Sequence, residues 1–250
     1  MNHGKVLMTT RADVFLVEHG YAASRAEAQA AIHAGNVRVG GAPVVKSSQS
    51  IAEDAVIEYA KAHPYASRGG VKLAAALDRF ELSPMDLVCI DVGASTGGFT
   101  DVLLERGAKN VYAVDVGHGQ LHPRLAADPR VVSLEGVNAR DLTPTHIPEP
   151  LQVIVADVSF VGLKQVLPGA LQFAEPGSFL VALVKPQFEA GRENIAKGGI
   201  VKSEEARRKA LQSIVEWLGA QPHWSVLGTM ESPIAGGDGN REFLLAAKRT

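Results

Sequence analysis

The sequence has 250 residues, of which 46% are hydrophobic, and its formal net charge at pH 7 is −2. That length permits one large hydrophobic core with a second, smaller one, and the near-neutral charge excludes binding to nucleic acid through bulk charge alone. Cys89 is the only cysteine, which excludes an intrachain disulfide framework and predicts a reducing, cytoplasmic location. Neither a signal-peptide pattern nor an apolar run of about 18 residues is found, so we expect no membrane segment.

Residues 1–60 predict a small α+β domain. The stretch RADVFLVEHG has apolar residues at helical spacing and ends at a glycine. Ser24 and Glu27 form a capping box for a second helix, which ends at Gly35. Two short strands around a Gly-Gly turn in NVRVGGAPVV and a third strand in DAVIEYA complete a unit of marginal size.

Residues 71–250 predict a second domain, and residues 61–70 predict a linker because they are rich in small residues. In the second domain, four apolar runs alternate with helical stretches: LVCIDVGA, NVYAVDVG, QVIVADVSF and SFLVALVKP. Such alternation is typical of an α/β fold with a parallel sheet. The tail REFLLAAKRT predicts a last, antiparallel strand at the edge of that sheet.

The first strand of this domain leads into a glycine loop, with the spacing Gly93-x-x-x-Gly97-Gly98, and then into a helix. Glycines let a ligand approach the backbone closely, and free N–H groups at the start of a helix can bind it. Because the spacing is not G-x-G-x-x-G, an amino-acid or nucleoside ligand is favoured over a pyrophosphate. A tight turn without a ligand is the alternative.

Polar side chains follow the next two strands. Asp115 ends the second strand, where a carboxylate can accept hydrogen bonds from ribose hydroxyls; a helix N-cap is its alternative role. Asn138 and Asp141 follow the third strand and could contact an adenine edge, or form only a polar turn. Together these features resemble the Rossmann-like core of an S-adenosylmethionine methyltransferase. The resemblance implies that Asp91 lies near the methionine end of the cofactor and that the loop beneath it consists of Gly93, Ala94, Ser95, Thr96, Gly97 and Gly98.

Charged residues also stand at the ends of the later strands. Asp157 ends the fourth strand, Lys185 ends the fifth, and Glu242 begins the last one. In an open α/β sheet, the carboxyl ends of the strands face the ligand crevice. Lys72 follows Gly69-Gly70 and opens a helix, where the macrodipole disfavours a cation, and the spacing is not that of a phosphate-binding loop. A surface ion pair of Asp157 with Lys185 and a solvated Lys72 are the alternatives.

The order Lys72, Asp157, Lys185, Glu242 matches the K-D-K-E tetrad of FtsJ-like ribose 2′-O-methyltransferases. Five motifs, SRGGVKL, DVGASTGGFTD, ADVSF, LVKPQFE and GGIVK, together resemble the TlyA family of ribosomal RNA 2′-O-methyltransferases, which is also labelled as haemolysin. The N-terminal domain resembles the alpha-L RNA-binding module shared with a small-subunit ribosomal protein. The resemblance runs from about Thr10 to Lys248, and it departs from the family pattern Arg-Leu-Asp at Ala12.

The resemblance implies an enzyme that uses S-adenosylmethionine to methylate cytidine ribose in ribosomal RNA, without a metal. Lys72, Asp157, Lys185 and Glu242 would be catalytic, and Lys72 would point into the crevice. A ribose hydroxyl is a poor nucleophile until its proton is removed, so a neutral Lys185 would accept that proton. Like charge from Lys72 and partial burial would favour the neutral amine, and the two carboxylates would hold the lysine heads in place. Ribosomal RNA or ribosomal subunits are the expected partners, and no obligate protein partner is indicated.

Phosphate contacts are expected from basic residues in both domains. The candidates are Arg11, Arg25, Arg38 and Lys46 in the small domain, Arg68 in the linker, and Arg192, Lys197 and Lys202 in a glycine-containing loop. The run from Arg207 to Lys209 follows that loop and has the alternative of a solvated helix face paired with Glu204 and Glu205. Two other classes of function stay open: a membrane-active cytolysin, which the absence of a membrane segment disfavours, and an RNA-binding protein with an inactive enzyme domain, which the complete tetrad disfavours.

Overall fold

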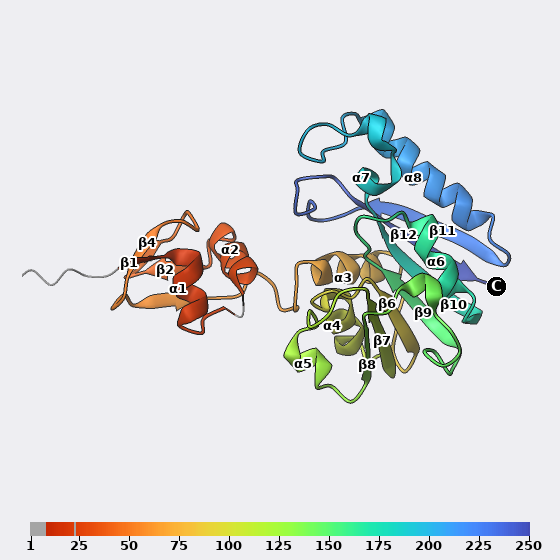
Figure 1. Ribbon diagram of the computed structural model, residues 1–250, viewed down its shortest axis with the longest axis horizontal. Helices are drawn as coiled ribbons and strands as arrows, with labels where there is room; N and C mark the ends of the chain where they lie inside the picture. Colours follow the sequence, from red (N-terminus) through yellow and green to blue (C-terminus); the bar gives the residue numbers. More distant parts are fainter. Residues whose placement is uncertain (1–8, 23) are drawn as a thin grey trace, which may run out of the picture. The chain divides into compact units, whose positions relative to one another are not determined.

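The computed structural model describes residues 9–22 and 24–250, and the chain divides into two compact units between Pro64 and Tyr65 (Figure 1). The second unit therefore begins six residues before the expected boundary at residue 71. Tyr65 and Ala66 pack against its core, and the backbone N–H of Ala66 donates to Asp101 Oδ2 at 2.7 Å. Residues 65–70, expected as part of the linker, thus belong to the second unit.

The first unit is a small α+β fold built around one core. Its elements are β1 (Thr9–Arg11), α1 (Ala12–Glu18), α2 (Arg25–His33), β2 (Val37–Val39), β3 (Ala42–Pro43), β4 (Ser50–Ala52) and β5 (Ile57–Tyr59). Strands β3, β2 and β5 form an antiparallel sheet in that order, and β1 pairs with β4. Ser24 Oγ accepts a hydrogen bond from the backbone N–H of Glu27, as expected of an N-cap at the start of α2.

The second unit is built on a seven-stranded sheet, in the order β11-β12-β10-β9-β6-β7-β8 (Figure 1). Its strands are β6 (Val88–Val92), β7 (Asn110–Asp115), β8 (Val131–Glu135), β9 (Leu151–Ala156), β10 (Ala174–Val184), β11 (Trp224–Glu231) and β12 (Phe243–Arg249). Strands β6 to β10 run parallel to one another, whereas β12 is antiparallel to both β10 and β11. The predicted α/β fold is confirmed.

The expectation that the tail forms the edge strand is wrong, because β11 pairs outside β12. The two strands differ in burial: Leu244 to Ala247 are all fully buried, so β12 is covered on both faces, whereas exposed and half-buried positions alternate along β11 after the buried Trp224. A continuous apolar run is typical of an interior strand, and alternation is typical of a half-exposed one. The apolar run in the tail therefore indicated an interior position.

Helices cover both faces of this sheet. They are α3 (Gly69–Arg79), α4 (Gly98–Glu105), α5 (Pro123–Ala126), α6 (Leu163–Leu171), α7 (Pro186–Glu189) and α8 (Glu204–Gly219), with 3₁₀ turns η1 (Ala139–Asp141) and η2 (Arg192–Asn194). Alternate residues of each strand enter different cores: Ile90 packs with α6 and α8, whereas Cys89 packs with α3 and α4. Asp91, two residues after Cys89, therefore faces the side of the sheet that carries α3 and α4.

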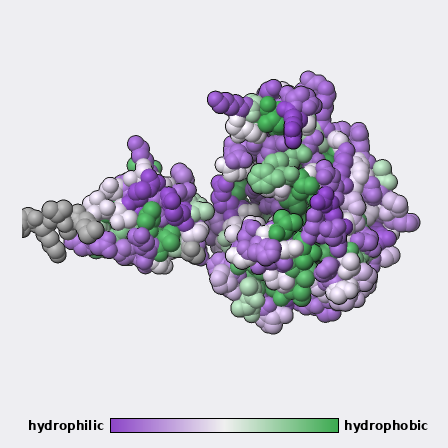
Figure 2. All heavy atoms as spheres, viewed as in Figure 1, coloured by the Kyte–Doolittle hydropathy of each residue, from purple (hydrophilic) through white to green (hydrophobic). Residues whose placement is uncertain are grey.

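Hydrophilic side chains cover most of the visible face of the second unit, and a band of hydrophobic side chains crosses its middle (Figure 2). Among residues 9–22 and 24–250, no helix is both long enough and apolar enough to cross a membrane.

Candidate active site

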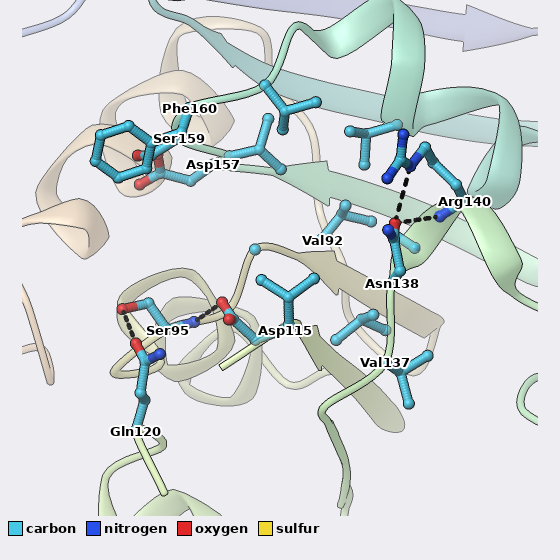
Figure 3. A pocket seen from close by; sticks show the side chains of 17 residues that line it. Val92, Ser95, Asp115, Gln120, Val137, Asn138, Arg140, Asp157, Ser159 and Phe160 are labelled. Carbon is cyan, nitrogen blue, oxygen red and sulfur yellow. Dashed lines mark hydrogen bonds between the residues drawn. The ribbon is translucent and has the colours of Figure 1, made fainter. Parts of the chain in front are cut away.

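A cavity of about 470 Å³ lies at the carboxyl ends of β6, β7 and β9. Valines from these strands and from the following loops form much of its wall, and a few polar side chains face into it. In Figure 3, Ser95, Gln120 and Asp115 lie on one side of the cavity, Asn138 and Arg140 on another, and Asp157 to Phe160 along a third. An apolar cavity with few polar groups is typical of a small-ligand site.

The glycine loop forms one wall because its backbone passes close to its neighbours. Gly93 has φ of 85°, and a Cβ atom there would come within 2.7 Å of the backbone oxygen of Asp157. A Cβ on Gly98 would overlap the Ser67 hydroxyl, so the start of α4 packs directly against the segment that precedes α3. Only glycine satisfies both positions without displacement of the backbone or the hydroxyl.

Asp115 holds this loop in place from the end of β7. Its Oδ2 accepts a hydrogen bond from the backbone N–H of Ser95 at 2.9 Å, and its Oδ1 accepts one from that of Gly117 at 2.7 Å. The Ser95 hydroxyl in turn bonds to Gln120 Oε1 at 3.2 Å. A carboxylate has about four lone-pair positions, so Asp115 retains acceptor capacity toward a ligand.

Four of the ten expected cofactor residues line the cavity: Gly93, Ser95, Asp115 and Asn138. Asn138 Oδ1 accepts hydrogen bonds from the backbone and side chain of Arg140, which also lines the cavity. The other six do not line it: Asp91, Ala94, Thr96, Gly97, Gly98 and Asp141. Gly97 and Gly98 belong to the same loop but pack against other parts of the protein, and Asp141 lies in η1.

Asp91 is completely buried beneath the loop. Its Oδ2 accepts hydrogen bonds from the backbone N–H of Thr100 at 2.8 Å and from the Thr100 hydroxyl at 2.7 Å. Its Oδ1 has no hydrogen-bond partner among the described residues. Burial raises the pKa of Asp91 to about 7, and the hydrogen bonds from Thr100 oppose this shift only in part. Asp91 thus joins β6 to the start of α4.

Lys72 and Glu242 form a buried ion pair. Lys72 Nζ lies 2.6 Å from Glu242 Oε2, and the two side chains are 8% and 3% exposed. Lys72 is in the first turns of α3, and Glu242 directly precedes β12. The alternative of a solvated lysine is therefore excluded. The carboxylate balances a cation that the helix N-terminus alone would disfavour.

Lys185 and Asp157 form a second ion pair at the edge of the cavity. Lys185 Nζ lies 2.6 Å from Asp157 Oδ1 and donates to the Ser159 hydroxyl at 2.8 Å. Asp157 and Ser159 both line the cavity. The side chains of the pair are 11% and 22% exposed, so this is not a freely solvated surface pair.

Two observations place the ion pairs near each other. Gln187, two residues after Lys185, donates to Glu242 Oε1 at 3.4 Å. Asp157 Oδ2 lies 3.4 Å from the position that a Cβ on Gly69 would take, one turn before Lys72. The fold thus gathers all four expected catalytic residues, from α3, β9, β10 and β12, into one region beside the cavity.

An exposed aromatic ring stands next to this region. Phe160 is 92% exposed and has φ of 65°, in the left-handed region that a bulky residue rarely adopts. Its ring lies 5.3 Å from that of Phe188, with an angle of 52° between the planes. Both rings line a second cavity of about 260 Å³ together with Gln165, Gln187 and Arg192.

A family model for FtsJ-like methyltransferases matches residues 65–249, and a model for the S4 domain matches residues 10–57. The chain belongs to the FtsJ-like methyltransferase family. It is 41% identical to the 16S/23S rRNA (cytidine-2'-O)-methyltransferase TlyA of Mycobacterium tuberculosis, over 94% of this chain and 88% of that protein. It is also 41% identical to Hemolysin A of Brachyspira hyodysenteriae, over 94% of this chain and 98% of that protein.

A solved structure of a haemolysin-labelled protein from Streptococcus thermophilus is similar throughout. It has a TM-score of 0.76 and 40% identity, and the match covers 98% of this chain and 90% of that one. The expected membership of the TlyA family and the small N-terminal module are thereby confirmed.

Two of the basic residues expected to contact RNA form ion pairs with a carboxylate in the S4 unit. Arg11 Nε and Arg25 Nη2 bond to the fully buried carboxylate of Asp13 at 3.0 and 2.8 Å, and Gln29 adds a third bond at 2.8 Å. The hydrogen bond from Arg11 contributes most to holding the pKa of Asp13 well below its usual range. The arginine side chains stay about half exposed, so they are fixed in position yet accessible.

The other expected RNA contacts are exposed. Arg38 donates to the backbone oxygen of Gly41 at 2.9 Å, and Lys202 to that of Glu193 at 3.0 Å. The remaining four are Lys46, Arg68, Arg192 and Lys197. The run Arg207 to Lys209 pairs with Glu204 and Glu205 on α8, which is the alternative that the sequence left open for it.

Several residues at the site were not predicted from the sequence. Ser159 and Phe160 stand two and three residues after Asp157, and an aromatic residue beside a serine in a strand-end loop was the available signal. Gln120 and Arg140 line the cavity from loops with no distinctive spacing. Asn240 carries no signal in the sequence, because its role depends on a contact with a segment about forty positions away.

The buried carboxylate of Asp91 predicts a pH-dependent stability. Its folded-state pKa of about 7 lies above the ~3.9 of an unfolded aspartate. Between these values the native state binds a proton that the unfolded state lacks, so stability falls as pH rises. We expect the unfolding free energy of the cofactor-free protein, relative to Asp91→Asn, to fall by up to about 1.4 kcal/mol per pH unit in this range. Urea titrations between about pH 5 and pH 8 measure it; a constant difference would contradict the assignment.

The buried pair of Lys72 and Glu242 predicts non-additive stability changes. Glu242→Gln leaves a buried ammonium without a countercharge and should cost about 3–5 kcal/mol. Lys72→Met combined with Glu242→Gln should be more stable than either single variant, because no unpaired charge remains. Equilibrium unfolding of all four proteins measures the coupling. The exposed pair Lys209 and Glu205 is the control, with coupling below about 1 kcal/mol. Additive changes at the buried pair would mean that the two residues do not interact.

Proposed function

We propose that this protein transfers a methyl group from S-adenosylmethionine to the ribose 2′-hydroxyl of a cytidine in ribosomal RNA. The observation that carries the proposal is the position of the Lys185–Asp157 pair. Both partners of Lys185, Asp157 and Ser159, line the cavity, and a second, buried lysine–carboxylate pair lies beside them. The substrate class follows the name of the M. tuberculosis relative. A ribosomal substrate would place the reaction in the cytoplasm.

The cavity suits S-adenosylmethionine in size and polarity. Its volume of about 470 Å³ is within the ~300–1,000 Å³ of small-ligand sites. Asp115 at the end of β7 can accept the ribose hydroxyls of a nucleoside, while valines on both sides suit an adenine ring. Gly93 lets the glycine loop pass close to the backbone of Asp157, and both residues line the cavity. When bound, the cofactor supplies an electrophilic methyl group on a sulfonium.

Lys185 is the proposed general base. The ammonium of Lys185 would first release a proton to solvent; the neutral Nζ would then accept the proton of the 2′-hydroxyl while the bond from that oxygen to the methyl carbon forms and the bond from carbon to sulfur breaks. Asp157, 2.6 Å from Nζ, then holds the ammonium that results. The hydroxyl of Ser159, two residues after Asp157 in the loop that follows β9, accepts a hydrogen bond from the same nitrogen and helps to fix its position.

Lys72 and Glu242 are proposed to position the reacting hydroxyl. Their pair is fixed at 2.6 Å and excluded from water, so its ammonium has few alternative positions. A group held in this way adds alignment rather than proton transfer, and alignment alone can account for a large part of a rate enhancement. Asp157 Oδ2, next to Gly69, brings the two pairs toward the same reacting group.

RNA would be held by groups from both units. In the S4 unit, Arg11 and Arg25 are pre-organised on Asp13, which lowers the entropy lost when they bind phosphates. In the second unit, the exposed ring of Phe160 offers a surface on which a nucleobase can stack while its ribose lies at Lys185. Arg192 lines the second cavity, of about 260 Å³, together with Phe160 and can contact a phosphate.

The first prediction of this proposal concerns the cofactor. Asp115→Asn removes the charge that would accept ribose hydroxyls and should weaken binding of S-adenosylmethionine by about 1.5–3 kcal/mol in calorimetric titrations. Asp141→Asn is the matched control: Asp141 was also a sequence candidate but does not line the cavity, so its affinity should not change. Equal losses in both variants would contradict the placement of the ribose at Asp115.

The second prediction concerns the reaction. Lys185→Ala removes the proposed base and should lower the rate of methyl transfer to ribosomal RNA by about 10²–10⁴-fold, with cofactor affinity retained. Labelled methyl transfer, followed by mapping of 2′-O-methyl positions on RNA from cells with and without the protein, measures both rate and target. Lys164→Ala, an exposed lysine on α6 bonded to Ser213, is the control. Full activity of Lys185→Ala, or cell lysis by the purified protein without cofactor, would overturn the proposal.

A further inference from the structure

The segment 190–202, here called the basic loop, follows α7 and carries Arg192, Lys197 and Lys202. The loop folds back on itself: Ile195 and Val201 form a β-bridge, and the backbone N–H of Ala196 donates to the oxygen of Ile200 at 2.8 Å. Its tip, from Lys197 to Gly199, contains two glycines with positive φ. Internal bonds thus shape the loop but do not attach it to the sheet.

Asn240 attaches the basic loop to the turn between β11 and β12. Its Oδ1 accepts a hydrogen bond from the backbone N–H of Val201 at 3.0 Å, and its Nδ2 donates to the backbone oxygen of Gly199 at 3.0 Å. Asn240 is only 3% exposed and Val201 only 1%. Among residues 9–22 and 24–250, these are the two hydrogen bonds that join the basic loop to this turn. The side chain of Asn240 therefore makes the two hydrogen bonds to the loop backbone that a neighbouring strand would otherwise make.

The same turn supports Glu242. The backbone N–H of Ser232 donates to the oxygen of Glu242 at 2.9 Å, and that of Gly236 donates to the oxygen of Asn240 at 2.9 Å. A Cβ on Gly236 would come within 2.5 Å of Glu242 Oε1, so the turn packs directly against the carboxylate that pairs with Lys72. A displacement of the turn would displace this carboxylate.

The basic loop is therefore connected to Glu242 from both sides, through α7 before it and through Asn240 near its C-terminal end. On the N-terminal side, Gln187 in α7 donates to Glu242 Oε1 at 3.4 Å. On the C-terminal side, Asn240 holds Gly199 and Val201 from two positions before Glu242. Movement of the loop by a ligand would reach the buried ion pair through these two contacts.

We propose that Asn240 is a positioning residue that couples the basic loop to the Lys72–Glu242 pair. An RNA phosphodiester backbone bound by the cations of the loop fixes the loop, and Asn240 transmits that order to Glu242. The inference rests on the proposed function, since it takes RNA as the ligand and methyl transfer as the output. It adds a route by which the correct substrate, rather than the cofactor, completes the active site.

Asn240→Ala removes both bonds and should lower kcat by up to about 100-fold, the effect of a displacement near 1 Å at a reacting group. Affinity for S-adenosylmethionine should not change, because neither Asn240 nor the basic loop lines the 470 Å³ cavity. Asn240→Asp keeps an acceptor for Val201 but loses the donor to Gly199, and should give an intermediate kcat. Asp238→Ala, an exposed residue of the same turn, is the control and should keep its kcat.

A merely structural role is distinguished by a double-mutant cycle with Lys197→Ala. In the otherwise wild-type protein, Lys197→Ala should raise KM for RNA and also lower kcat, because a loop without bound phosphate no longer orders Glu242. In the Asn240→Ala background it should raise KM only. Independent effects of the two changes on kcat would overturn the inference.

Hydrogen exchange supplies a readout that does not need activity. RNA binding should slow exchange in the peptide that contains Glu242 in the wild type and not in Asn240→Ala. If Asn240→Ala fails to fold, the same comparison is made with Asn240→Asp. Wild-type protein that methylates RNA, together with Asn240 variants of unchanged kcat and exchange, would overturn only this inference. Wild-type protein that methylates no RNA would instead overturn the proposed function.

Discussion

The buried ion pair of Lys72 and Glu242 is the constraint on which the rest of the site depends. It joins residues 170 positions apart in the sequence and fixes the start of α3 against the start of β12. A buried pair rarely adds much net stability, because desolvation of both charges offsets their attraction. The pair therefore fits the positioning role proposed for it, which needs a fixed cation and no gain in stability.

The second constraint is the direction of the strands. Because β6, β7, β9 and β10 are parallel, their carboxyl ends bring Asp91, Asp115, Asp157 and Lys185 to one edge of the sheet. The residues then divide by depth. Asp91 is buried and organises α4 through Thr100, whereas Asp115 and Asp157 line the cavity. One pattern of strand-end carboxylates thus provides both the support of the site and its ligand-facing groups.

Pre-organisation recurs in the groups proposed to meet RNA. Asp13 fixes two arginines in the S4 unit, and Asn240 fixes a loop that carries three cations. In both cases a buried polar side chain with several partners holds charged groups that stay exposed. Ordering such groups before binding reduces the conformational entropy that binding would otherwise remove.

The sequence by itself determined the class of fold and the two-unit organisation, because strand periodicity and the glycine loop are local patterns. Its resemblance to FtsJ-like methyltransferases indicated the four residues of the tetrad, whose catalytic role stays a prediction. Tertiary structure decided the rest. It gave β12 an interior position, assigned residues 65–70 to the second unit and turned Asp91 away from the cavity. It also paired Lys72 with Glu242 and Lys185 with Asp157, and it revealed Asn240. These features depend on contacts between distant segments, and the local spacing of residues holds no record of which partner a charge or an amide will meet.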